Sequence, residues 1–313
     1  MEIKSIKIGG VTTKNNLFFA PLAGFSDSCM RKIAIECGAG LAFTEMVSCK
    51  GLKYTPSASR ELLHFYPEET PRAVQIFGSD PDIMGEIARS EHLKDFDIID
   101  INMGCPVPKI YNNGEGSALL NNPQLAYKII SEVKRANKPV TVKFRIGVST
   151  DKIITETFAK TCEDAGADLI TVHGRTRDNY YSGEPNYDEI AKAKKAVKIP
   201  VIANGGIFSK SDADIMMDRT GADGVMIARG ALENPLLFSE ILGVKPQKTI
   251  KQIILEQIEM LSSRYGKERS AIVFRKQAAY YLKGVQGGRK LRDKIFSSNN
   301  IGEVVSLISS AEF

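Results

Sequence analysis

One cysteine has neighbours in the sequence that suit it for a catalytic role. Cys105 follows the apolar run 98–101 and lies between Gly104 and Pro106. Glycine and proline favour a sharp turn, which places the thiol at the mouth of a buried strand. A free thiol has a pKa of about 8.5, so at neutral pH it is mostly protonated and can donate a proton. Cys105 is therefore a candidate general acid. Pairing with His173 would instead make it a nucleophile.

The other cysteines carry no comparable signal. Cys29, Cys37, Cys49 and Cys162 form no C-x-x-C pair, and the three histidines show no zinc-ligand spacing. We therefore expect neither a disulfide framework nor a metal site. These four thiols are expected to behave as small buried hydrophobes.

Two polar residues interrupt apolar runs. Lys143 lies inside Val-Thr-Val-Lys-Phe-Arg, and Gln75 lies inside Ala-Val-Gln-Ile-Phe. A buried lysine needs an anionic partner, and a buried amide needs a hydrogen-bonding one. Lys143 can hold the edge of an anionic ring, form a Schiff base, or pair with Asp100 or Glu45. Each alternative remains open from the residues alone.

Glycine-rich turns follow the last two apolar runs. Gly205 and Gly206 come after Asn204, and Gly230 follows Arg229. Such turns let backbone N–H groups approach a phosphate, and arginine adds a charged donor. Tight turns without a ligand are the alternative. A phosphate site together with an amide and a lysine would suit flavin mononucleotide (FMN).

Short apolar runs alternate with amphipathic segments over about 240 residues. Each run is too short for a helix and nearly continuous in apolar content, as in strands buried on both faces. Alternation of this kind predicts a parallel sheet, and eight repeats predict a (β/α)8 TIM barrel. A doubly wound open sheet is the alternative, but the sequence has no G-x-G-x-x-G or P-loop fingerprint. The runs are Asn16–Ala20, Leu41–Glu45, Ala73–Phe77, Asp97–Asn102, Val140–Arg145, Asp168–His173, Ile199–Asn204 and Gly224–Arg229.

The composition changes near Gly243. From Lys245 onward the chain carries 13 Lys and Arg against 6 Asp and Glu, a net charge of +7, whereas the rest carries 29 against 31. Its periodicity predicts an appended all-α helical bundle, with Ser270 capping the second helix. The predicted domains are residues 1–243 and residues 244–313. A basic domain on a nearly neutral body favours a polyanionic partner, although a solvated helical face would look the same.

The sequence also limits the cellular setting. No apolar run reaches the roughly 18–20 residues that span a bilayer. The N-terminal segment alternates polar and apolar residues, which predicts a strand and not a signal peptide. We therefore expect a cytoplasmic protein with no membrane partner. The sequence carries no signal for oligomeric state.

Eight segments together resemble the signature motifs of the tRNA-dihydrouridine synthases, closest to the bacterial B-type subgroup. They occur in family order from Ala20 to Pro235, and "FRKQAAYYLKG" resembles the family's tRNA-binding helical domain. The segments are "APLAGFSD", "TEMVS", "QIFGSDP", "DINMGCP", "VTVKFRIG", "TVHGRTRDNYYSG", "PVIANGGI" and "GADGVMIARGALENP".

The resemblance implies an NAD(P)H- and FMN-dependent oxidoreductase that reduces the C5–C6 double bond of particular uridines in tRNA. NADPH would be the hydride source. Reduced flavin N5 would deliver hydride to C6, and Cys105 would give the proton to C5. The resemblance also implies that residues 1–243 bind FMN and that residues 244–313 bind tRNA.

The resemblance also assigns binding residues. Asn102 and Arg175 would face the substrate base, and Lys109, Arg275 and Lys276 would contact tRNA. The implied FMN ligands are Pro21, Leu22, Ala23, Gln75, Lys143, His173, Asn204, Gly205, Gly206, Ala228 and Arg229.

The chain departs from the family pattern in three places. Gly206 replaces a usual aspartate, and Tyr187 stands where tryptophan is usual. Pro108, Asn112 and Asn113 occupy a loop that commonly carries lysines.

Three other functions are open from the residues. An FMN barrel acting on a small molecule such as dihydroorotate would share the flavin site but leaves the basic tail unexplained. A Lys143 Schiff-base lyase would use no flavin. A non-catalytic RNA-binding module would keep the barrel without turnover.

Overall fold

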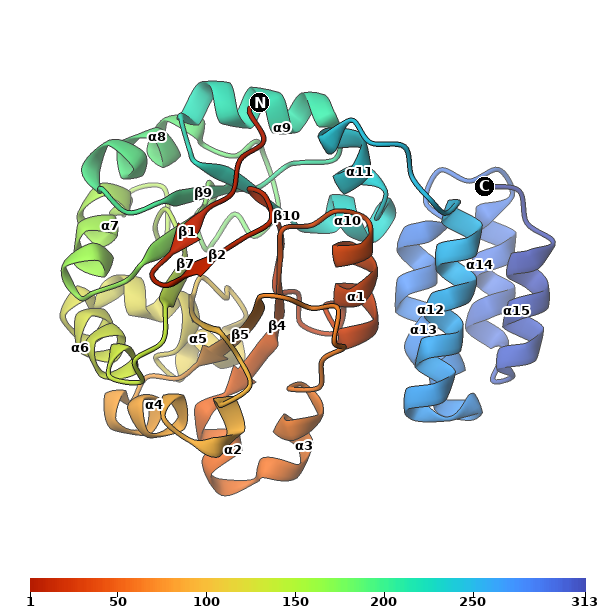
Figure 1. Ribbon diagram of the computed structural model, residues 1–313, viewed down its shortest axis with the longest axis horizontal. Helices are drawn as coiled ribbons and strands as arrows, with labels where there is room; N and C mark the ends of the chain where they lie inside the picture. The colour runs from red at the N-terminus through yellow and green to blue at the C-terminus, as the bar shows by residue number, and fades with distance from the viewer.

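The computed structural model describes residues 1–313, except for the side chain of Ala58. Eight parallel strands close into a barrel in the order β10-β3-β4-β5-β6-β7-β8-β9, which confirms the predicted fold class (Figure 1). The strands are β3 (Leu17–Phe19), β4 (Leu41–Ser48), β5 (Arg72–Phe77), β6 (Ile98–Met103), β7 (Val140–Arg145), β8 (Leu169–His173), β9 (Val201–Asn204) and β10 (Gly224–Ile227).

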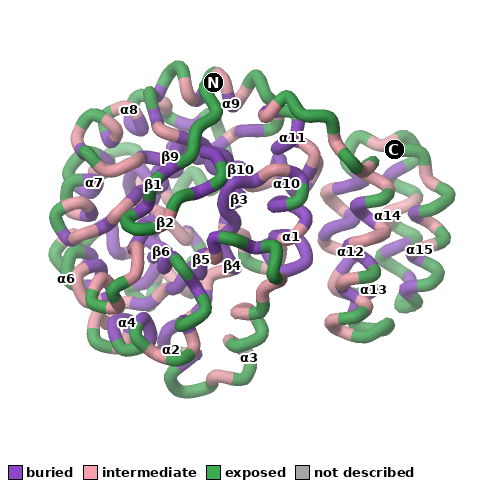
Figure 2. Tube along the Cα trace, in the orientation of Figure 1, coloured by how far each residue is buried: buried purple, intermediate pink, exposed green. Residues whose placement is uncertain are grey.

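Helices surround the strands and cover their outer faces. Figure 2 shows the result, because the strands at the centre of the barrel are coloured as buried. Asparagine and serine caps mark several starts, such as Asn186 before α8 and Ser209 before α9. The helices are α1 (Ser28–Glu36), α2 (Cys49–Tyr54), α3 (Pro56–Glu61), α4 (Pro81–Ala88), α5 (Pro108–Asn112), α6 (Pro123–Lys134), α7 (Thr155–Asp164), α8 (Tyr187–Ala196), α9 (Lys210–Thr220), α10 (Arg229–Glu233) and α11 (Leu237–Leu242), with 3-10 turns η1 (Glu91–Leu93) and η2 (Gly116–Asn121).

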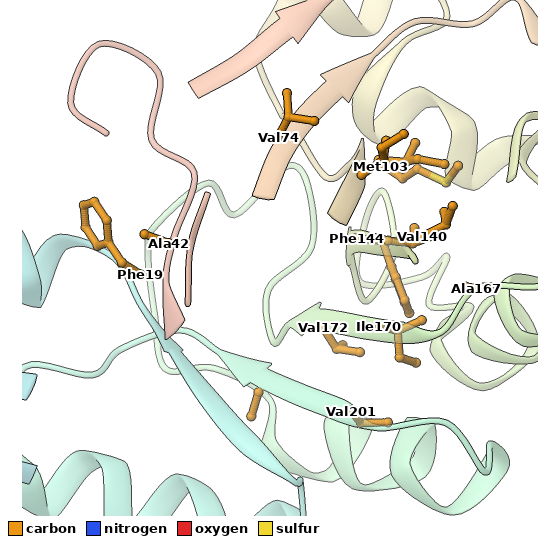
Figure 3. Close-up of a cluster of buried hydrophobic side chains, with 14 of the residues drawn as sticks. Phe19, Ala42, Val74, Met103, Val140, Phe144, Ala167, Ile170, Val172 and Val201 are labelled. Carbon is orange, nitrogen blue, oxygen red and sulfur yellow. The ribbon is translucent and has the colours of Figure 1, made fainter. Parts of the chain in front are cut away.

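Successive residues of each strand face opposite sides of the barrel wall. On β8, Ile170 and Val172 join the core between strands and helices, whereas Leu169 joins the barrel interior. Figure 3 shows part of the outer core, including Phe144 and Val172. Both faces are therefore buried, which explains the nearly continuous apolar runs.

The barrel interior changes character along its axis. Phe18, Leu41, Ile98 and Ile202 pack together inside it. Two residues further along these and neighbouring strands, the inward positions carry polar side chains such as Asp100 and Asn204. The amino-terminal part of the interior is thus a packed core, and the carboxyl-terminal part is the place for a site.

Two expected strands have different bounds in the structure. The strand expected through Arg229 ends at Ile227, and Arg229 begins α10. The N-terminal strand is reduced to β1 (Lys7–Ile8), which forms a short hairpin with β2 (Val11–Thr12). Because Ile8 is buried in the barrel interior, the hairpin closes that end.

Four helices form the C-terminal bundle: α12 (Ile250–Tyr265), α13 (Lys267–Tyr281), α14 (Gly288–Ser297) and α15 (Ile301–Ser309). Ile254, Phe274 and Val304 share its apolar core. Ser270 does not cap the second helix, because α13 starts three residues earlier, after Gly266. Its hydroxyl instead donates to the Lys267 carbonyl at 2.8 Å.

The bundle packs against the barrel through α12 on α1 and α13 on α10 (Figure 1). Gln277 Nε2 donates to the Phe25 carbonyl at 3.1 Å, and Lys283 pairs with Glu233 at 2.7 Å. The bundle is therefore docked beside the first strand–helix connection. In the part of the chain that the structure describes, no helix has the length and apolar content needed to cross a bilayer.

A buried ion pair holds that first connection. Arg31 Nε donates to Glu69 at 2.6 Å, and its other nitrogens donate to the carbonyls of Ser26 at 2.8 Å and His64 at 2.6 Å. The Ser26 hydroxyl in turn accepts from the Leu22 N–H at 2.9 Å. Arg31 thus ties the 60s loop to the 20s loop, which lies over the barrel mouth.

Replacing Glu69 with alanine should strongly destabilise the fold. Arg31 is 1% exposed, and removing its carboxylate leaves a buried charge without its counterion. Breaking a buried pair in this way costs about 3–5 kcal/mol. Urea unfolding followed by circular dichroism measures the loss. Glu68→Ala is the matched control, because Glu68 is exposed and its pair with Lys32 contributes little. Equal midpoints for the two variants would contradict the role of Arg31.

Candidate active site

A cavity of about 470 Å³ opens at the carboxyl ends of the strands. This is the end at which barrel enzymes bind their ligands, and the volume lies in the range of small-molecule sites. Every residue predicted to hold FMN lines it, together with Cys105, Asn102 and Arg175. The tertiary structure therefore brings the predicted set into one place, while their roles remain predictions.

The backbone of Cys105 is held on both sides. Its N–H donates to Asn102 Oδ1 at 2.9 Å, and its carbonyl accepts from the Ser117 hydroxyl at 2.7 Å. Gly116 has a φ of +60°, and a Cβ there would lie 3.0 Å from the Cys105 Cβ. Because only glycine fits this conformation and this gap, the segment after the corner can close tightly on the cysteine.

Burial sets the protonation of this thiol. Burial raises the pKa of Cys105, and the Val107 N–H and the charges of Arg145 and Lys143 oppose it only in part. The thiol is therefore neutral at pH 7 and suited to donate a proton. The other four cysteines are buried, as their sequence contexts predicted.

Lys143 is a half-buried cation in the wall of the cavity. Among the described side chains no carboxylate lies within 4.0 Å of its ammonium group. Asp100 instead accepts hydrogen bonds from Gln75 and Thr141. Glu45 accepts one from the Gly24 N–H. The ion pair with Asp100 or Glu45, one of the alternatives left open by the sequence, is therefore not formed among the described side chains. Burial, then Arg145, lowers the pKa of Lys143 to about 8. The lysine is still largely protonated at neutral pH and favours an anionic ligand.

His173 is neutral within a group of cations. Burial first, then the charges of Arg145, Lys143, Arg175 and Arg229, hold its pKa well below the usual range. Arg175 Nη1 lies 3.3 Å from His173 Nε2. Since a guanidinium only donates, Nε2 accepts and the proton sits on Nδ1.

The turn after β9 approaches these side chains closely. Gly205 has a φ of +132°, and a Cβ there would lie 3.1 Å from Arg175 Nη1 and 3.2 Å from a ring carbon of His173. Glycine is therefore required for the close approach. Beyond it, the Arg229 guanidinium lies over Tyr181, 4.7 Å from the ring centre.

The predicted substrate residues are placed unequally. Arg175 donates to the Gly183 carbonyl at 2.7 Å, which fixes it at the cavity edge. Lys109 is exposed on α5, and Lys276 lies 5.6 Å from the centre of the Phe25 ring. Arg275 donates to the Ser298 carbonyl at 3.0 Å, inside the bundle. The structure thus brings only Asn102 and Arg175 into the cavity.

Several lining residues were not predicted. Arg145 Nε donates to the Gly104 carbonyl at 2.9 Å, directly behind Cys105. Its position at the end of a strand was the available signal. Tyr280 comes from the helical bundle and packs edge-on against Phe25, with ring centres 5.2 Å apart. Nothing in the periodicity of α13 distinguishes it. The other unpredicted lining side chains include Met46, Tyr181 and Phe208.

Two of the departures from the family pattern have a local structural account. Tyr187 packs under Arg219, whose guanidinium carbon lies 4.1 Å from the ring centre. The segment after Pro106 forms α5 and η2, in which Asn113 ends the helix.

The sequence matches known proteins over nearly its whole length. A family model described as dihydrouridine synthase matches residues 18–311. The chain is 39% identical to tRNA-dihydrouridine synthase B of Pasteurella multocida (strain Pm70) over 291 residues, which cover 90% of this chain and 88% of that one. It is 37% identical to the probable tRNA-dihydrouridine synthase 1 of Synechocystis sp. over 319 residues, with coverages of 98% and 89%.

Solved structures share the barrel at low sequence identity. A 2-naphthoyl-CoA reductase has a TM-score of 0.62 and 12% identity, covering 78% of this chain and 52% of that one. A morphinone reductase mutant in complex with tetrahydroNAD has a TM-score of 0.56 and 13% identity, with coverages of 80% and 92%. This chain thus spans about half of the naphthoyl-CoA reductase chain. At these identities the likeness shows the fold alone.

Alkylation of the native protein should label Cys105 alone and accelerate with pH. The other four thiols are buried, and the pKa of Cys105 lies above its usual value. The pH midpoint of the rate with iodoacetamide should therefore lie above the ordinary value of about 8.5. Mass spectrometry of peptides from pH 6 to 10 measures it, with Cys105→Ala as the unlabelled control. A plateau near pH 7 would show a thiolate and contradict the neutral acid.

Proposed function

Because the chain belongs to the dihydrouridine synthase family, we propose that it reduces the C5–C6 double bond of a uridine in tRNA, using FMN and NADPH. The observation that carries the proposal is the neutral thiol of Cys105 at a cavity that Lys143, Arg145, Arg175 and Arg229 also line. A small-molecule reductase would need no bundle, whereas here α13 contributes Tyr280 to the cavity rim.

The residues present fit FMN. A cavity of about 470 Å³ can hold most of a ligand of this size. The Lys143 ammonium group has no carboxylate within 4.0 Å among the described side chains, so an electron-rich ring edge would compensate its charge. The backbone of Gly205 and Gly206 also lines the cavity and can offer N–H donors to a phosphate, and the Arg229 guanidinium adds a cation to the same lining. When bound, FMN supplies the hydride that C6 of uracil receives.

Cys105 then acts on C5. A uracil that has gained hydride at C6 carries negative charge at C5 and O4, and the neutral thiol donates its proton to C5. The resulting thiolate is stabilised by the groups that oppose the raised pKa of Cys105: the Val107 N–H, Arg145 and Lys143. A proton from solvent restores the thiol.

The surrounding residues orient the base and exclude water. His173 carries its proton on Nδ1, and Arg175 stands at the cavity edge. Taking a uridine out of its stack costs a few kcal/mol. Phe25, Tyr181 and Tyr280 line the mouth and provide aromatic surface that offsets part of this cost.

Contacts to the tRNA backbone supply the remainder. We propose residues 1–243 as the FMN-binding barrel and residues 244–313 as the tRNA-binding domain, whose net charge is +7. Lys109, which is exposed on α5, and Lys276 on α13 are the candidate phosphate contacts. Arg275 acts in this scheme by holding α13 to the loop after α14.

The function is tested with purified protein, FMN, NADPH and tRNA that lacks dihydrouridine. One uridine should gain two mass units, and Cys105→Ala should lower the rate by about 10²–10⁴ while FMN and tRNA still bind. Mass mapping of the tRNA gives the position and the rate. Cys37→Ala, at the end of α1 and outside the cavity lining, is the control. No mass gain with the wild-type protein would overturn the proposed activity, and full activity in Cys105→Ala would overturn the acid role.

Lys143→Met should weaken FMN binding and remove a source of pH dependence. Losing a charged contact to the ring should raise the dissociation constant roughly tenfold or more. Because the folded-state pKa of Lys143 is lowered to about 8 from 10.5, the unfolded chain binds more protons between these values. Wild-type apo-protein should therefore gain stability from pH 8 to 10.5 relative to Lys143→Met.

Fluorescence titration with FMN and urea unfolding at several pH values check both effects. Lys128→Met, at an exposed position on α6, is the matched control. Unchanged FMN affinity in Lys143→Met would count against the flavin site.

A further inference from the structure

A hydrogen-bond chain leads from the centre of the barrel to Cys105. Asp100 on β6 is fully buried and accepts from the Thr141 hydroxyl at 2.5 Å and from Gln75 Nε2 at 2.6 Å. Gln75 Oε1 accepts from Asn102 Nδ2 at 2.8 Å. Asn102 Oδ1 accepts from the Cys105 N–H at 2.9 Å. Four side chains on three adjacent strands are thus joined to the backbone of the proposed acid.

The two ends of the chain determine its direction. Burial raises the pKa of Asp100 to about 7. In its ionised form the carboxylate only accepts, so Gln75 turns its NH₂ group toward Asp100 and its oxygen toward Asn102. Backbone N–H groups only donate, so Asn102 must turn its oxygen toward Gly104 and Cys105. Both amides therefore have one possible orientation. Each keeps a second N–H hydrogen, and both side chains line the cavity.

We propose that Asp100 is a positioning residue that orients both amides, so that Asn102 holds the Cys105 corner and the wall presents amide N–H donors to ligand carbonyl groups. These donors suit the carbonyl oxygens of a uracil or flavin ring. The role in turnover rests on the proposed function, whereas the orientation of the corner does not.

The position of Asp100 supports an orienting role. Burying a carboxylate costs stability, and an apolar side chain would fill the interior at lower cost, as Ile98 does two residues earlier on the same strand. Burial raises the pKa of Asp100, and the hydrogen bonds from Thr141 and Gln75 oppose this rise more than the charge of Lys143, which forms no ion pair with Asp100 among the described side chains. Asp100 accepts two side-chain hydrogen bonds. One comes from Gln75, which continues the chain to Cys105, and the other comes from Thr141 on the adjacent strand.

Two variants test the proposal, with one matched control. Asp100→Leu removes the acceptor, and Asp100→Asn keeps the shape but permits the reversed orientation of Gln75. Thr171→Val is the control, because Thr171 is fully buried two residues before the cavity-lining His173, and its hydroxyl has no partner among the described residues.

The first readout needs neither cofactor nor substrate. Amide hydrogen exchange in the apo-protein should accelerate at Gly104 and Cys105 by roughly tenfold in Asp100→Leu, and less in Asp100→Asn. Iodoacetamide should label Cys105 faster in the same order, while strands β8 and β9 keep their protection. Thr171→Val should match the wild type.

The second readout is turnover on tRNA. A displaced thiol should lower kcat by about tenfold, with KM for tRNA within about twofold of wild type. If Asp100→Leu does not fold, Asp100→Asn carries the test. The proposal would be overturned if Asp100→Asn, and Asp100→Leu where it folds, exchanged the Gly104 and Cys105 amides and labelled Cys105 at the wild-type rates. A third outcome separates the two proposals. If the Asp100 variants show altered exchange but the wild-type protein forms no dihydrouridine, the positioning role is supported and only the proposed function is overturned.

Discussion

Closure of the barrel is the constraint on which the rest of the structure depends. Once eight parallel strands form a closed wall, every second side chain must enter a shared interior. Near β1 and β2 this interior is filled with apolar side chains such as Phe18 and Leu169. At the opposite end the same geometry brings Asn102, Lys143 and Asn204 to the wall of one cavity, although they come from three different strands. A packed lower half thus supports a polar upper half.

The electrostatics of the upper half follow from that crowding. Lys143, Arg145, Arg175 and Arg229 all contribute to the lowered pKa of His173, after burial. Four cations around one cavity favour an anionic ligand and keep the histidine neutral. Burial simultaneously keeps the Cys105 thiol protonated, so a proton donor stands beside a wall that stabilises the charge formed on donation.

The helical bundle, proposed above to bind tRNA, also contributes a residue to the cavity. Tyr280 reaches the cavity edge from α13, and Gln277 on the same helix bonds the Phe25 carbonyl. Phe25 lies in the segment that follows β3 and includes Pro21, Leu22 and Ala23. Binding of a polyanion to α13 therefore has a short physical route to the segment proposed to hold the flavin.

The amino-acid sequence by itself determined the eight strands, because burial on both faces leaves continuous apolar runs, and it determined the family, because "NMGCP" and "HGRTR" are specific motifs. It also located Cys105 and Gly205 after strand ends and Lys143 within a strand. Only the tertiary structure decided which side chains are partners. Asp100 bonds Gln75 and not Lys143, and Arg145 supports Gly104. Tyr280 and Cys105 line the same cavity, although more than 170 residues separate them in the sequence. These contacts depend on strand stagger and domain docking, which local periodicity does not encode.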